Sequence, residues 1–192
     1  MKTLLLTAAF LLITCITSKA QIIAGQAGPG DTLQNSNYYM TIGGSGYGYF
    51  RDTINIDSDT SNYFTFLIAR IHIMSGVETR YLSIGAHGQW EVLDSLHSCM
   101  PSSSSEAWMI KNDTSGSLIN GIGNWVNGGY FAVDENGDPQ YFCFLDEFSS
   151  GGYVGIRKKL PNDTLYGWMK IKATGFSILL ESYAYNKGIT GI

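Results

Sequence analysis

The chain has 192 residues, a formal net charge of −4, and 13% aromatic residues, which are ample for a hydrophobic core. Charged residues make up only 15% of the chain, below the usual share of about a quarter. The one basic run is Arg157-Lys158-Lys159, and such an acidic chain argues against nucleic acid or an anionic membrane surface as a partner.

The N-terminal segment has the layout of a cleavable secretory signal. Lys2 supplies a positive charge, an apolar run extends over Leu4–Ile16, and the small residues Ser18 and Ala20 follow. We therefore predict cleavage between Ala20 and Gln21, a signal peptide at 1–20 and a single secreted domain at 21–192. Since the apolar run is shorter than the roughly 20 residues that a bilayer span needs, no transmembrane segment is expected in the mature chain.

A lipid anchor at Cys15 is the alternative interpretation of the same segment. Cys15 follows the apolar run, as the acylated cysteine of a lipoprotein does. The residue before it is Thr14, whereas that motif normally has glycine or alanine there. The sequence favours export to the periplasm, cell surface or medium by cleavage after Ala20.

Short runs of β-branched and aromatic residues, separated by Gly, Asn, Asp and Ser, dominate the rest of the chain. This pattern predicts an all-β fold, an antiparallel, jelly-roll-like β-sandwich. We expect residues 94–106 to be irregular. The predicted strands are Tyr38–Ile42, Tyr47–Ile54, Tyr63–Met74, Arg80–Ile84, Gln89–Leu93, Trp108–Lys111, Gly129–Val133, Tyr141–Phe148, Tyr153–Lys159, Leu165–Ala173 and Ser177–Tyr185.

A loop at the start of the second quarter has the ligand types of a calcium site. Asn55, Asp57 and Asp59 place oxygen-bearing side chains at alternate positions, as calcium loops do. Thr60 stands where such a loop has glycine, and Tyr63 where a later carboxylate is expected. An Asp-rich turn without metal explains the same residues, so both readings stay open.

Two cysteines, Cys99 and Cys143, remain after signal cleavage. In an oxidising compartment an even pair indicates a disulfide. Cys143 lies in the apolar run Tyr141–Leu145, where a buried free thiol is equally compatible with the sequence.

The clearest local unit is a hairpin whose strands Tyr153–Lys159 and Leu165–Ala173 are joined by a turn at Pro161. Strand alternation places Tyr153, Arg157, Tyr166 and Trp168 on one face. If exposed, these aromatic rings would form a platform on which a sugar's apolar face stacks. Packing inside a sandwich is the competing explanation.

The same region resembles a known pattern. The segments Tyr153–Arg157 (YVGIR), Leu165–Ile171 (LYGWMKI) and Ser182–Asn186 (SYAYN) are similar in order and spacing to secreted bacterial domains of unknown function, many with a PEP-CTERM or related sorting tail. The stretch 55–66 is a degraded match to an acidic motif of that family. The resemblance implies an extracellular β-sandwich and no particular activity. Because no hydrophobic stretch of that type precedes Gly191-Ile192, we do not expect sorting to the cell surface by such a tail.

Catalytic motifs are weak in this sequence. The segment Gly43–Gly48 does not have the spacing of a Gly-x-Ser-x-Gly nucleophile elbow. His87 lies in a Gly-Ala-His-Gly turn, and nothing pairs two carboxylates as a glycosidase requires. We therefore expect a non-enzymatic, surface or extracellular binding or structural protein without a cofactor. A carbohydrate-binding module and an extracellular hydrolase are the alternatives, and a glycan or cell-surface component is the expected partner.

Overall fold

The computed structural model describes residues 21–41, 47–72, 78–99, 107–135, 143–144, 148–174 and 177–186; the predicted signal peptide lies outside these ranges. Within them the predicted all-β fold is confirmed. No helix in these ranges is long and apolar enough to cross a membrane. The strands are β1 (Ile22–Ile23), β2 (Thr32–Thr41), β3 (Gly48–Ile54), β4 (Phe64–His72), β5 (Glu78–Ala86), β6 (Trp90–Cys99), β7 (Ala107–Ile110), β8 (Leu118–Ile119), β9 (Asn124–Val126), β10 (Gly128–Glu135), β11 (Cys143–Phe144), β12 (Gly152–Lys159), β13 (Thr164–Thr174) and β14 (Ser177–Tyr185).

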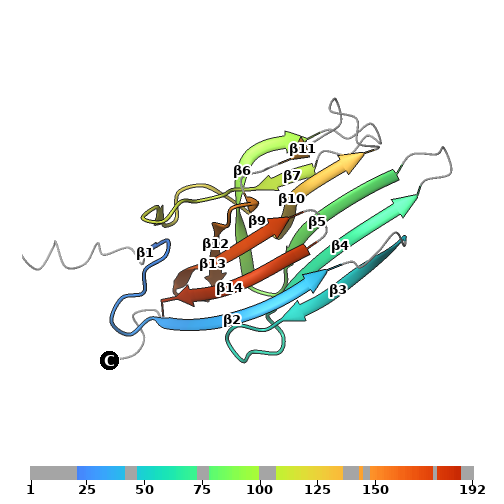
Figure 1. Ribbon diagram of the computed structural model, residues 1–192. Coiled ribbons are helices and arrows are strands. Elements are labelled where there is room, and N and C mark those ends of the chain that lie inside the picture. The colour runs from blue at the N-terminus through green and yellow to red at the C-terminus, as the bar shows by residue number, and fades with distance from the viewer. Residues whose placement is uncertain are drawn as a thin grey trace, which may run out of the picture.

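One long sheet forms both layers of the predicted sandwich. Its hydrogen-bonded order is β2-β14-β13-β12-β6-β7-β10-β5-β4-β3, and every pairing is antiparallel except the single contact of β7 with β10. The sheet curls so that its end strands β2 and β3 approach each other (Figure 1), where the Tyr38 hydroxyl donates to Asp52 Oδ2 at 2.6 Å. The sandwich is therefore nearly closed, with a side-chain bridge in place of a strand ladder at the seam.

The main core fills the space between the two halves of the curled sheet. Alternate residues of β4 and β5 point inward from one half, and alternate residues of β12, β13 and β14 from the other. The side chains of Phe66, Tyr38 and Phe131 meet across this space. The predicted inward face of β13 is confirmed, because Met169 and Ile171 are fully buried.

A second, smaller core lies on the opposite face of β13. There the short β1–β8 ladder covers the outer side of the sheet, and Trp168 Nε1–H donates to the Gln26 carbonyl oxygen at 2.8 Å. Burying an outer face in this way requires a chain segment that contributes its own apolar residues. The members of this core are Ile22, Ala24, Ile119, Tyr166, Trp168 and Ala184.

The strand predictions fail mainly where the chain is polar. β2 begins at Thr32 rather than at Tyr38, because pairing with β14 holds a Gln-Asn-Ser-Asn stretch of low strand propensity in the ladder. Two residues bulge out opposite one of β14 at this point, and Asn37 there has a left-handed φ of 49°. Likewise β6 continues to Cys99 through residues expected to be irregular, since β7 pairs with its second half.

An ion-pair network lies on the inner face near the C-terminal end of β4 and the N-terminal end of β5. The carboxylate of Glu78 accepts hydrogen bonds from the guanidinium groups of Arg70, at 2.8 Å, and of Arg80. These bonds lower the pKa of the Glu78 carboxyl from 4.5 to about 2. The network therefore satisfies three charged side chains that are only partly exposed.

This pKa shift predicts a loss of stability in acid. A carboxyl with a lowered folded-state pKa stabilises the fold above its ordinary pKa, and this contribution disappears as the pH falls from about 5 to about 2. We expect Glu78→Gln to reduce the free energy of unfolding at pH 7 by about 1 kcal/mol. In urea titrations the difference from the unsubstituted protein should shrink as the pH approaches 2, and a constant difference would contradict the network.

Candidate functional site

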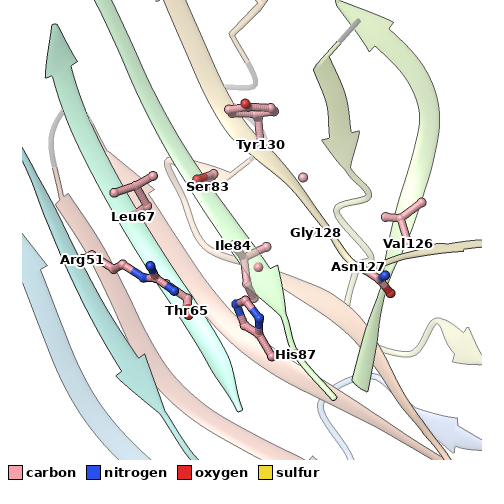
Figure 2. Close-up of a pocket in the computed structure, with 12 residues that line it drawn as sticks. Arg51, Thr65, Leu67, Ser83, Ile84, His87, Val126, Asn127, Gly128 and Tyr130 are labelled. Atoms are coloured by element: carbon pink, nitrogen blue, oxygen red, sulfur yellow. The ribbon is translucent and has the colours of Figure 1, made fainter. Parts of the chain in front are cut away.

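A hollow of about 560 Å³ lies on the outer face of the sheet half formed by β3, β4, β5 and β10 (Figure 2). We call it the outer hollow. It is separate from the main core, which lies on the other face of the same strands. Its position on four adjacent strands means that a rigid ladder, rather than a single loop, supports its base.

Two neighbouring cross-strand rows build the base of the outer hollow. In the first row Arg51, Leu67, Ser83 and Tyr130 are direct partners on β3, β4, β5 and β10. Direct partners in antiparallel strands carry their side chains on one face. The large residues Arg51 and Tyr130 stand at the two ends of this row, with the smaller Leu67 and Ser83 between them.

The second row makes the depression because its side chains are small. Thr65, Gly85 and Gly128 are direct partners on β4, β5 and β10. A Cβ added to Gly128 would lie 2.5 Å from the Ile84 carbonyl oxygen, so the close approach of the two strands requires glycine there. A Cβ on Gly85 would come within 3.3 Å of His87 Nε2, which shows that the imidazole lies directly over this glycine.

His87 forms the wall at the end of the second row. Its ring stacks on Tyr63 with centroids 4.5 Å apart, and its backbone N–H donates to the Tyr63 carbonyl oxygen at 2.9 Å. These contacts fix the ring at the end of the β4–β5 ladder, where β4 begins and β5 ends. The exposed Asn127 lies across from it, and its carbonyl oxygen accepts from the Ala86 N–H at 2.7 Å.

Thr65 holds an unused hydrogen-bonding group beneath this wall. The residue is only 6% exposed, and its Oγ1 has no hydrogen-bond partner among the described residues. A buried hydroxyl without a partner costs about 1–3 kcal/mol, and such groups are rare. The hydroxyl of Thr65 is therefore a buried polar group that no described residue satisfies.

The electrostatic character of the outer hollow differs from that of the whole chain. Its lining contains the guanidinium of Arg51 and the imidazole of His87, and none of its described lining residues is Asp or Glu. Arg51 is exposed and, in the part of the chain that the structure describes, has no ion pair. The hollow thus presents an uncompensated positive charge on a protein with net charge −4.

The predicted sugar platform on the β12–β13 hairpin is wrong. Tyr153, Arg157, Tyr166 and Trp168 do share one face, as the register of the two strands shows. However, Tyr166 is 9% and Trp168 3% exposed, because β1 and β8 cover them. The rings are packed against neighbours, with Tyr153 and Trp168 edge to face at 5.4 Å, so no open stacking surface exists there.

The guanidinium of Arg157 also has partners within the protein and is not available to a ligand. It forms an ion pair with Glu91 and lies 4.7 Å from the centre of the Trp125 ring. The packing explanation that the sequence left open accounts for this face.

The predicted calcium loop is occupied by a lysine. Nζ of Lys158 lies 2.7 Å from Asp57 Oδ2 and 3.2 Å from Asp59 Oδ2, where a cation would bind. The side-chain oxygens of Asn55, Asp57 and Asp59 each accept the backbone N–H two residues further on, as in successive Asx turns. Among the described residues no three His, Cys, Asp or Glu side chains are placed to hold a metal ion. The Asp-rich turn, closed by Lys158, therefore replaces the calcium interpretation.

Two predicted features fall outside what the structure describes. The backbone of Cys99 ends β6 and that of Cys143 begins β11, but their side chains lie outside the described part, so the disulfide stays a prediction. Cleavage between Ala20 and Gln21 also stays a prediction, since residues 1–20 are not described.

Comparisons of the chain with protein-family models, with characterised proteins and with solved structures gave no match. The function of the protein must therefore be inferred from the geometry of the outer hollow. The sequence drew attention only to His87, as part of a turn. Arg51, Ser83 and Tyr130 lie in separate strands. The one sequence signal for them is that each occupies an outward-facing position in the alternation of its strand. This signal becomes informative only when the register between the strands is known.

Proposed function

We propose that this protein is an exported, non-catalytic binding protein and that its outer hollow takes a saccharide. The observation that carries the proposal is the combination of one aromatic wall, Tyr130, with a ring of hydrogen-bonding groups around a glycine base. Saccharides present both apolar C–H faces and many hydroxyl groups, so a flat ring and several donors and acceptors suit them together. The secretory layout of residues 1–20 and the resemblance to exported domains support a site of action outside the cytoplasm.

The size of the hollow suits a small ligand or one part of a larger molecule. A volume of about 560 Å³ lies within the range of small-molecule sites, and its base follows the direction of the cross-strand rows. The ring of Tyr130 is held by an edge-to-face contact with Tyr81 at 5.8 Å between centroids. A ring held in this way loses little conformational freedom when a ligand stacks on it.

The chemistry of the lining supports binding rather than hydrolysis. Glycoside hydrolysis by the common mechanisms uses two carboxyl groups on either side of the scissile bond. The described lining residues offer none, and within the described part of the chain no hydrogen bond joins Ser83 to His87, as nucleophilic catalysis would require. For this reason we place the hydrolase alternative behind binding.

Replacing Tyr130 with alanine should weaken saccharide binding by about tenfold, the value of roughly 1.4 kcal/mol expected for one stacked ring. The measurement is retention of the mature protein, residues 21–192, on an array of neutral and acidic oligosaccharides, followed by calorimetry with the best probe. Tyr39→Ala is the matched control, because Tyr39 is 59% exposed on β2 in the other half of the sheet. Equal retention of both variants and the parent protein would exclude the hollow as the site.

A structural role through self-association is the second candidate, and one observation favours it. β3 ends the hydrogen-bonded strand order, and its residues Tyr49 and Phe50 are 73% and 53% exposed. An exposed edge with apolar side chains is a template for pairing with another chain. Sedimentation of the same protein over a range of concentrations distinguishes the candidates: concentration-dependent dimers without glycan retention would replace the binding proposal.

A further inference from the structure

We infer that the saccharide bound in the outer hollow carries an acidic group, and that Arg51 holds its carboxylate or sulfate oxygens. This inference rests on the proposed function and adds the chemical class of the ligand. It starts from the distribution of ion pairs over the four arginines of the chain. Arg70 and Arg80 are paired with Glu78, and Arg157 with Glu91.

Arg51 is the exception among them in the described part of the chain. No carboxylate of that part pairs with it, although the protein has more acidic than basic residues. The neighbouring carboxylate, Asp52, points to the other face of β3, where it accepts from the Tyr38 hydroxyl and the Thr53 N–H. The guanidinium is therefore free to bind an external anion.

The surroundings of Arg51 supply the other contacts that an acidic sugar needs. Its side chain extends from β3 across β4 toward Thr65 (Figure 2). Leu67 on β4 is the direct cross-strand partner of Arg51. Thr65 is two residues before Leu67 on β4, so its side chain lies on the same face. The hydroxyl of Ser83 and the imidazole of His87 lie along the same hollow. An acidic sugar ring thus meets a cation at one end and the Tyr130 ring at the other.

Electrostatics over the whole molecule strengthen this preference. The chain as a whole has a net charge of −4, which disfavours the approach of an anionic ligand. A hollow whose described lining residues include no carboxylate, and which contains the guanidinium of Arg51, concentrates such a ligand at one place. The planar fork of arginine matches two oxygens of a carboxylate or sulfate at once, which a lysine ammonium does not.

The test compares oligosaccharides that differ only in charge. Trigalacturonate and its methyl ester share size and hydroxyl groups, and a sulfated galactose trisaccharide provides the second anion. We expect the mature protein to bind at least one acidic probe about tenfold more tightly than the methyl ester, with an affinity that falls as salt rises. The tighter of the two acidic probes identifies carboxylate or sulfate as the group.

Arg51→Gln should abolish the preference for the acidic probe, and Arg51→Lys should restore it only in part, because the charge returns without the fork. Lys172→Gln is the matched control, since it removes one positive charge from an exposed position of β13 in the other half of the sheet. Thermal melting of each variant checks that the fold is retained, as expected for the exposed Arg51. Equal binding of acid and ester by parent and Arg51→Gln protein would overturn the inference, while Tyr130-dependent binding of the ester would leave the proposed function intact.

Discussion

Replacing Trp168 with alanine should lower the free energy of unfolding by about 4 kcal/mol, the usual cost of removing a buried tryptophan. The side chain is 3% exposed and packs edge to face on Tyr153. Its indole N–H donates to the Gln26 carbonyl oxygen, so the substitution also leaves that oxygen without its partner. Urea denaturation of residues 21–192, followed by tyrosine and tryptophan fluorescence, measures the change.

The size of this effect separates a packed tryptophan from an exposed binding platform. Tyr49→Ala is the control, because Tyr49 is 73% exposed and its truncation should change the stability by no more than about 0.5 kcal/mol. Trp168→Phe should fall between the two, since it keeps much of the apolar volume and loses the hydrogen bond. A Trp168→Ala protein as stable as the Tyr49→Ala protein would show that β1 and β8 do not cover this face in solution.

Lys158→Met should destabilise the fold by about 3 kcal/mol, because it leaves the carboxylates of the 55–62 turn without their counter-ion. Lys158 is 7% exposed, and its Nζ contacts Asp57 and Asp59 and lies 5.9 Å from the centre of the Trp90 ring. Burial by itself lowers the pKa of Lys158, but the hydrogen bonds to the two aspartates outweigh it and the pKa is raised. The ammonium group is therefore charged at neutral pH and acts as an internal cation. Chemical denaturation at pH 7 measures the loss.

The adjacent lysine provides the control for this substitution. Lys159 is 57% exposed, and its partner Glu91 is also held by Arg157, so Lys159→Met should cost less than about 1 kcal/mol. Adding millimolar calcium should leave the melting temperature of the unsubstituted protein unchanged. A calcium-dependent rise in that temperature, or equal effects of the two methionine substitutions, would contradict the role assigned to Lys158.

The hairpin of β12 and β13 shows how far sequence reasoning reaches. Alternation along β13 correctly placed Met169 and Ile171 on the core side and Tyr166 and Trp168 together on the other. Local pattern cannot reveal that the second face is also covered, because the residues that cover it, Ile22 and Ile119, are far away in the chain. Coverage of a sheet face is decided by long-range packing.

The loop at Asn55 shows the same limit for a polar site. Alternating oxygen ligands indicated a cation at this loop, and a cation is present there. Its identity, the ammonium of a lysine about 100 residues later, follows only from the position of β12 beside the turn. The outer hollow is even harder to predict from the sequence, because Arg51, Ser83 and Tyr130 become neighbours only through the register of four strands.

The sequence by itself therefore determined the all-β class, the inward faces of the strong strands and the acidic composition of the chain. These properties depend on composition and on a period of two residues, which are local. Tertiary structure alone decided that Trp168 is packed, that Lys158 neutralises the Asp-rich turn, and that Arg51, which has no ion pair in the described part of the chain, shares a hollow with Tyr130. The reason is that burial, counter-ions and binding sites arise from contacts between distant segments, which only strand register and sheet curvature specify.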